Sequence, residues 1–268
     1  MRVARLVLSL SVSFPVSISL AAQQTATSSP QALLLLQQSL RALVGGQTLS
    51  DVTLSGTARR IAGSDDETGT VVLKAASSGA LRLDFSYPSG PRAELRSAAT
   101  TDALPTGAWS GPDGAAHPIA LHNLANDWGL VPAFTVANAL SAKNGLTTYI
   151  GHETRDGQSV LHLRASRQFP QVRGNAANLL QHLSEMDIFF DAASLLPVAI
   201  TYSTHPDDNA GLDIPVEIRL SDYRAVNGVK VPFHIERYIN GTLQLEITVA
   251  NVVLNPGLSV SDFVPSTN

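Results

Sequence analysis

Two Asn-Gly pairs near the end of the chain, Asn227-Gly228 and Asn240-Gly241, most constrain what this sequence can fold into. Each pair lies between alternating apolar and polar residues, within "DYRAVNGVKVPFHIERYINGTLQLEITVANVVLN". Asn-Gly in this setting is typical of a tight β-hairpin turn, because both turn residues adopt positive φ. The stretch therefore predicts three consecutive antiparallel strands.

The first turn fits a two-residue loop. A loop of that length at Asn227-Gly228 places Leu220 opposite Ile235 and Val226 opposite Val229, so that apolar residues meet at both ends. At the second turn the same loop would place Ile235 opposite Glu246. A shift of one residue turns every side chain to the other face, so we predict a three-residue loop over 239–241 there.

With these registers the last three strands share one largely apolar face. Pro232 cannot donate to a strand ladder, so it predicts an edge position or a bulge within the middle strand. The residues of the shared face are Val216, Ile218, Leu220, Val231, Phe233, Ile235, Leu245, Ile247 and Val249.

A helix with clear ends lies near the start of the chain. Ser29 is suited to cap it, Pro30 to its first position and Gly45 to its end. Its predicted apolar face consists of Leu33, Leu36, Leu40 and Leu43 or Val44.

Between Leu49 and Thr100 the apolar period changes to two, which predicts an antiparallel meander. Its clearest apolar face is formed by Leu81, Leu83, Phe85 and Tyr87. The first part of residues 101–144 is rich in Gly and Pro, which predicts a loop or a short hairpin. The second part predicts two helical pieces, broken near Gly129 and Pro132. Strands return after Gly145, with a hairpin turn at Asp156-Gly157 and a short helix before the next hairpin.

These elements predict an α+β fold that is mainly β. A curved antiparallel sheet would form an unclosed β-barrel covered by helices. We expect a single domain over residues 29–268, with a helical and irregular insert at about 101–144.

The first 22 residues predict a secretory signal peptide. Arg2 and Arg5 precede a short apolar run, and small residues near Ala21 precede the polar Gln23. We expect cleavage near 21–23, a flexible lead over 23–28, and a periplasmic or secreted mature chain. No other segment offers the ~20 apolar residues of a membrane-spanning helix.

Composition excludes several classes of function. The formal net charge is −4 and no long basic run exists, so nucleic acid is not an expected partner. The chain contains no cysteine, which excludes disulfides, a thiol nucleophile and cysteine-bound zinc. It also excludes an N-terminal lipidated cysteine.

The lack of recognisable catalytic motifs favours a protein that is not an enzyme and holds no cofactor or metal. The sequence contains no HExxH, GxSxG, P-loop or dinucleotide fingerprint. His152 and His162 flank a two-residue turn and point to opposite faces. His234 lies opposite Glu246 in the predicted register, where a cross-strand hydrogen bond is expected.

Two histidine-containing segments remain open as sites. The turn at 205–208, His-Pro-Asp-Asp, is interpreted as a polar turn, with loose cation binding as the alternative. If the chain were an exported hydrolase with a dispersed site, His117, His122 and Asp127 in the insert would be the first candidates.

The order of these features resembles the LolA/LolB-like superfamily. The resemblance rests on Tyr149, Gly151, Glu153 and Asp156-Gly157, on "FFDAASLLPVAI", and on the closing stretch, which is similar to outer-membrane lipoprotein-sorting proteins. It covers roughly residues 50–100 and 146–265. It implies an unclosed barrel whose concave apolar face binds acyl chains of lipids or lipoproteins, with envelope transport proteins as possible partners.

The resemblance also implies a hydrophobic pocket and a charged residue that latches the covering helices. Arg59 and Arg60 are candidates for the latch. An envelope-stress regulator of the RseB/MucB type is the alternative function within the superfamily. The predicted pocket residues are Leu81, Leu83, Phe85, Phe233, Ile235, Leu245 and Ile247.

Overall fold

The computed structural model describes residues 27–99 and 104–264, so the predicted signal peptide and most of the lead lie outside the described residues. One antiparallel sheet of 13 strands dominates it, in the order β6-β5-β4-β3-β2-β1-β13-β12-β11-β10-β9-β8-β7. The strands are β1 (Asp51–Ala62), β2 (Asp65–Ala76), β3 (Leu81–Tyr87), β4 (Gly90–Arg96), β5 (Gly107–Ser110), β6 (Ala116–Pro118), β7 (Gly145–Arg155), β8 (Gln158–Arg167), β9 (Met186–Asp191), β10 (Pro197–Thr204), β11 (Ile214–Val226), β12 (Val229–Ile239) and β13 (Thr242–Leu254).

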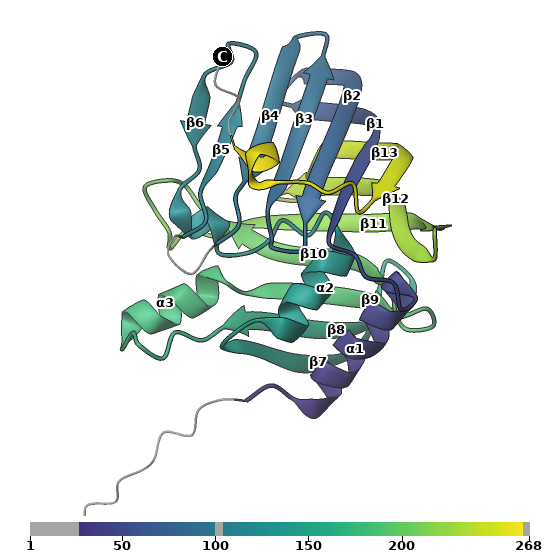
Figure 1. The fold of residues 1–268 in the computed structure, drawn as a ribbon. Helices are drawn as coiled ribbons and strands as arrows, with labels where there is room; N and C mark the ends of the chain where they lie inside the picture. Colours follow the sequence, from purple (N-terminus) through teal and green to yellow (C-terminus); the bar gives the residue numbers. More distant parts are fainter. Residues whose placement is uncertain (1–26, 100–103, 265–268) are drawn as a thin grey trace, which may run out of the picture.

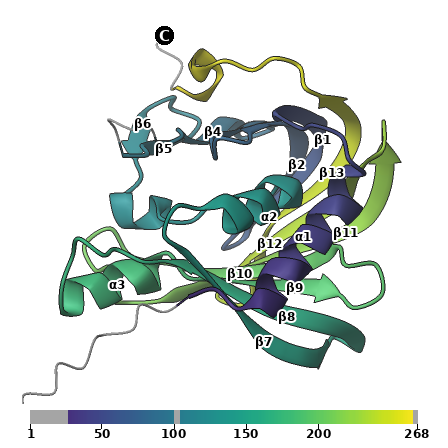
Figure 2. The same ribbon diagram turned by 60° about the horizontal axis from the view of Figure 1, so that its bottom comes forward.

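The sheet curls around two helices, α1 (Pro30–Val44) and α2 (Pro132–Ser141). Figures 1 and 2 show both helices between β1–β6 on one side and β7–β10 on the other. The sheet ends at β6 and β7, which do not pair with each other in the described part of the chain. The predicted mainly-β fold, an unclosed barrel covered by helices, is therefore confirmed.

Helix α1 begins and ends as predicted. The Ser29 hydroxyl accepts a hydrogen bond from the Ala32 backbone N–H at 3.1 Å, and Gly45 ends the helix at φ 57°. The buried face is rotated from the predicted one, because the helix packs against α2, β7 and β12 at once. Its buried residues are Ala32, Leu35, Leu36, Ser39 and Leu43, while Leu33 and Leu40 are half-buried.

The register at Asn227-Gly228 is confirmed. Leu220 pairs with Ile235, and Val226 pairs with Val229. Both turn residues have positive φ, 47° and 87°, as a two-residue turn of this type requires.

The three-residue loop predicted at the second turn is wrong. Ile239 pairs with Thr242, so Asn240-Gly241 is also a two-residue turn. A bulge between Arg237 and Tyr238 in the pairing then shifts the register, so that Ile235 faces Ile247. The bulge keeps the apolar residues on one face. The one-residue register shift that does so was expected in the turn, but it occurs within the strands.

Pro232 lies where β12 behaves as an edge. Its pairing with β13 starts only at His234, so on that side no ladder needs the missing proline N–H. The expectation of an edge-like position is confirmed.

The insert contributes more than helices. A short hairpin, β5 and β6, extends the sheet beyond β4, and the 3-10 helix η1 (Leu121–Leu124) follows it. Buried Arg96 donates to the Gly79 carbonyl oxygen and, at 2.9 Å, to that of Leu124, so β4 holds the end of η1. Asn126 donates to the carbonyl oxygens of Leu183 and Glu185, which joins the insert to the other half of the sheet.

No helix within residues 27–99 and 104–264 is long and apolar enough to cross a membrane.

Gly56 marks a close approach of two strands, at the bulge between β1 and β13. A Cβ added there would lie 2.0 Å from the Thr248 carbonyl oxygen. We predict that Gly56→Ala lowers the free energy of unfolding by about 2 kcal/mol or more, because backbone must shift. Urea denaturation measures it, with Gly151→Ala as control, since a Cβ at Gly151 meets nothing within 4 Å. Equal effects of the two variants would contradict the prediction.

The closing 3-10 helix η2 (Val260–Phe263) is tied to β2 by an ion pair. Lys74 donates to Asp262 at 2.8 Å, and Ser259 N–H donates to the same carboxylate at 2.9 Å. The Lys74 hydrogen bond is the main reason that the pKa of Asp262 falls to about 2 from its ordinary 3.8. A carboxyl whose pKa is lowered by folding stabilises the fold above its unfolded pKa and loses that contribution as pH falls.

We therefore predict that wild type and Asp262→Asn differ in melting temperature by a constant amount above about pH 4, and that the difference shrinks as pH falls toward about 2. Thermal melts at stepped pH measure this. A difference that stays constant through the acid range would contradict it.

Candidate functional site

The concave face of the sheet contains all seven predicted pocket residues, and the protein's own helices fill the space above them. The seven side chains are between 0% and 8% exposed and belong to one core cluster. Leu36 and Leu43 of α1 and Phe134 and Val136 of α2 belong to the same cluster. The structure therefore brings the predicted residues together as packed core.

An open cavity of about 330 Å³ adjoins this core, within the size range of small-ligand sites. It lies between β4–β6 and η1 on one side and β10–β12 on the other. Its apolar wall includes Trp109, Trp128 and Ile239, and its polar wall includes Glu94 and Arg237. The remaining lining residues are Pro118, Ile119, Asn123, Tyr202, Thr204, Asp207 and Val216.

Glu94 and Arg237, which line the cavity, form a bidentate ion pair. The Arg237 guanidinium donates to both Glu94 oxygens, at 2.6 and 2.7 Å. Glu94 pairs with Leu83, and Arg237 pairs with Leu245, so both project from the concave face. Their side chains are 27% and 17% exposed.

Each partner holds the other in its charged form. Burial alone would raise the pKa of Glu94, but Arg237 outweighs burial and holds it below its ordinary value. Burial would lower the pKa of Arg237, and Glu94 raises it instead. The pair is therefore ionised at neutral pH and places a fixed dipole beside the two tryptophans.

More charge lies on the same concave face. Arg60 and Arg92 both approach Glu67, at 3.3 and 3.9 Å. Burial, and then the Glu94 charge, raise the pKa of Tyr87 to about 12, and its hydroxyl has no hydrogen-bond partner among the described atoms. This end of the barrel interior is polar, and the end under α1 and α2 is apolar.

The two candidate latch residues face opposite sides of β1. Arg59 projects outward and pairs with Asp66 at 2.7 Å, whereas Arg60 is on the concave face with Ala58. Arg60 is therefore the better placed of the two to act inside the barrel.

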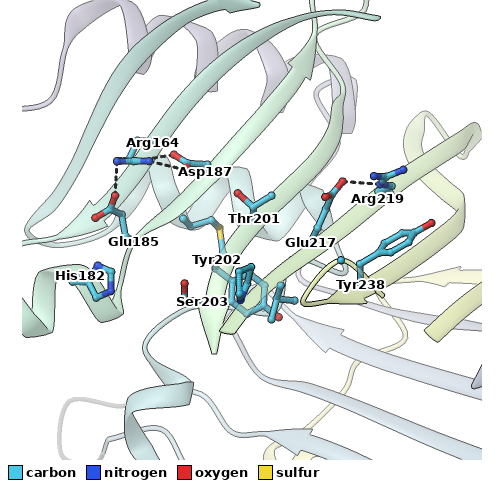
Figure 3. Close-up of a pocket in the computed structure, with 14 residues that line it drawn as sticks. Arg164, His182, Glu185, Asp187, Thr201, Tyr202, Ser203, Glu217, Arg219 and Tyr238 are labelled. Carbon is cyan, nitrogen blue, oxygen red and sulfur yellow. Dashed lines mark hydrogen bonds and ion pairs between the residues drawn. The ribbon is translucent and has the colours of Figure 1, made fainter. Parts of the chain in front are cut away.

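A second groove, of about 370 Å³, lies over outward-facing side chains of β8 to β12 (Figure 3). Arg164 pairs with Asp187 at 2.8 Å and with Glu185 at 2.7 Å, and Arg219 pairs with Glu217 at 2.6 Å. The charged side chains along this groove are paired with one another. A groove lined by ion pairs is better suited to contact water than to bind an acyl chain.

The three residues considered for a hydrolase have separate roles. His117 stacks on Trp109, with 4.2 Å between ring centroids. His122 Nε2 donates to the Pro206 carbonyl oxygen at 3.1 Å. Asp127 accepts hydrogen bonds from the Gly129 N–H and the Thr135 hydroxyl, at 3.0 and 2.9 Å, next to the start of α2.

The other histidine predictions are largely confirmed. His152 pairs with Leu161 and Gly151 with His162, so the two imidazoles face opposite sides. His234 hydrogen-bonds Glu246 at 3.0 Å as predicted, although its direct partner across the strands is Thr248. That difference follows from the two-residue turn at Asn240-Gly241 together with the bulge near Arg237.

Glu94 and Arg237 are not among the residues predicted for the site. The signal was present, because Arg237 continues the apolar face of Val231, Phe233 and Ile235 with a charge. A charged residue at an inward position must find a partner, but nothing in the sequence points to a strand 143 residues away.

No protein-family model matches the chain, and no curated protein matches it. Solved structures do match its fold. A domain described as an outer membrane lipoprotein-sorting protein domain, from Vibrio parahaemolyticus, superposes with a TM-score of 0.55 at 13% identity, covering 87% of this chain and 96% of that one. The fold is LolA-like.

Two further structures agree. A LolA superfamily protein from Nitrosomonas europaea has a TM-score of 0.54 at 10% identity, and a DUF1329 family protein from Desulfovibrio piger has 0.55 at 11%. Each covers 87% of this chain and is itself covered to 97%. At these identities the likeness establishes the fold alone.

The Glu94–Arg237 pair gives a third prediction. Arg237→Met leaves Glu94 without its partner inside the barrel and lowers the free energy of unfolding by about 1–3 kcal/mol, less than a fully buried pair because both side chains retain some exposure. The double variant Arg237→Met/Glu94→Gln recovers part of the loss, since no unpaired charge remains. Denaturant unfolding of both variants measures this, and a double variant no more stable than the single one contradicts it.

Proposed function

We propose that the chain is an exported, periplasmic binding protein for acyl chains of lipids or lipoproteins, with no catalytic activity of its own. The observation that carries the proposal is the cavity of about 330 Å³, with Trp109 and Trp128 beside the half-buried Glu94–Arg237 pair. An apolar wall and a fixed polar pair in one cavity match an amphiphile, which has an apolar chain and a polar end.

The energetics favour such a ligand. Burying an acyl chain gains ~0.8 kcal/mol per CH₂ group and needs a dry apolar surface but no reactive residue. Val216 and Ile239 line the cavity, and along β11 the apolar row continues through Ile218 to Leu220. A chain would follow this row toward the core.

A long acyl chain needs more room than the cavity offers. Phe134 of α2 packs in the same core cluster as Phe85 and Phe233 of the predicted pocket. The predicted residues therefore serve as ligand contacts only when α2 moves away from the sheet. In this proposal α2 is the cover, and the cavity is the part of the site that stays open.

The fold supports the proposal through its neighbours. One is described as a domain of an outer membrane lipoprotein-sorting protein, and another as a LolA superfamily protein. The predicted signal peptide supports export. Envelope transport proteins would be the donors or acceptors of the ligand.

We predict that mature protein, from Gln23 onward and exported from a bacterial host, carries a stoichiometric acyl species in the mass spectrum of its organic extract, or binds a fluorescent fatty acid saturably. Ile239→Trp fills the cavity and weakens fatty-acid binding by roughly tenfold, equivalent to ~1.4 kcal/mol. Val253→Trp is the matched control, because it adds the same side chain at an exposed position of β13.

A clean apo mass together with no binding of added fatty acid overturns the proposal. Equal affinities of the two tryptophan variants would leave acyl binding in place and move the site away from the cavity.

A further inference from the structure

Three side chains of metal-ligand type converge from separate segments at one end of the molecule. His182 lies in helix α3 (Asn175–Leu183), His205 directly follows β10, and Asp213 directly precedes β11. The Nε2 atoms of His182 and His205 lie 2.9 and 3.0 Å from the same oxygen, Oδ1 of Asp213. Figure 3 shows His182 projecting from its helix beside the outer groove.

Two imidazole nitrogens and one carboxylate oxygen form a ligand set that Zn²⁺ prefers, with three protein ligands and a fourth position for water. The three ligand atoms lie within 4.8 Å of one another. Ligands at ~2.0–2.2 Å from zinc are separated by about 3.3 Å in a tetrahedral site, so small side-chain movements would admit the ion.

His205 is the buried member of the group. Its side chain is 1% exposed, and its Nε2 faces the Asp213 carboxylate at 3.0 Å. Nδ1 of His205 has no hydrogen-bond partner among the described atoms, so no second hydrogen bond fixes which ring nitrogen carries the proton.

The backbone of His205 is also fixed in place. Asn123 of η1 accepts from the His205 N–H and donates to its carbonyl oxygen, both at 2.8 Å. The His122 ring packs edge-on against the His205 ring, with 5.9 Å between centroids. His182 and Asp213 are 45% and 44% exposed, so an ion reaches the group from the solvent side.

We propose that His182, His205 and Asp213 form a binding site for one Zn²⁺ ion. The ion would join α3, the 205–213 segment and, through Asn123, η1. This inference is independent of acyl binding. Loose cation binding is the alternative interpretation of the 205–208 turn, but the partners of His205 come from outside that turn.

The described residues contain another group of this kind, His234 with Glu236 and Glu246 on the outer face. It offers one imidazole and two carboxylates, a harder ligand set that suits zinc less well. It therefore serves as an internal comparison.

The test uses untagged mature protein, treated with a chelator, dialysed and titrated calorimetrically with zinc chloride. We expect one equivalent to bind and to raise the melting temperature. His182→Ala and Asp213→Asn, at exposed positions, each weaken binding by about tenfold or more and reduce the thermal shift. His152→Ala is the matched control, because it removes an exposed histidine from elsewhere on the sheet.

Absence of saturable binding at millimolar zinc overturns the proposal. So does binding that survives both His182→Ala and Asp213→Asn. Loss of binding in His234→Ala alone would assign the zinc to the outer-face group and also overturn it.

Discussion

The Glu94–Arg237 ion pair is the contact that spans the interior of the curled sheet. Glu94 lies on β4 and Arg237 on β12, and four strands, β3, β2, β1 and β13, lie between them in the sheet. A bidentate pair at 2.6 and 2.7 Å fixes both distance and orientation, because the guanidinium and carboxylate planes must align. The pair therefore ties β4 to β12 across the interior, where the polar end of the barrel meets its apolar end.

The insert at 101–144 also connects distant strands, through hydrogen bonds of its side chains and backbone. Its side chains reach backbone groups of the β7–β10 half of the fold: Asn123 holds the end of β10, and Asn126 holds the segment before β9. Arg96 of β4 in turn holds the end of η1. The cavity and the histidine cluster therefore adjoin the same segment, since Asn123 lines the cavity and also holds the backbone of His205.

The sequence was a good guide wherever local chemistry decides the structure. Asn-Gly turns, the Ser29 cap and two-residue alternation depend on residues close together in the chain. They predicted the strands, both ends of α1 and the apolar face of the sheet. The bulge near Arg237 was missed, because a bulge and a longer turn each shift the register by one residue and so place the same side chains on the apolar face. Glu94 with Arg237, and His182 with His205 and Asp213, were missed because their meeting depends on tertiary curvature, which no local pattern encodes.

The two free edges of the sheet are protected in different ways. β6 is only three residues long and ends in Pro118, so it offers few backbone groups to another chain. β7 is longer, but the segment before α1 crosses its rim, where Ser29 N–H donates to the Thr147 carbonyl oxygen and the Ser28 hydroxyl accepts from the Thr147 N–H. Both edges of the open barrel are thus shielded against strand addition by another chain, one by its shortness and the other by residues 28 and 29 of the same chain.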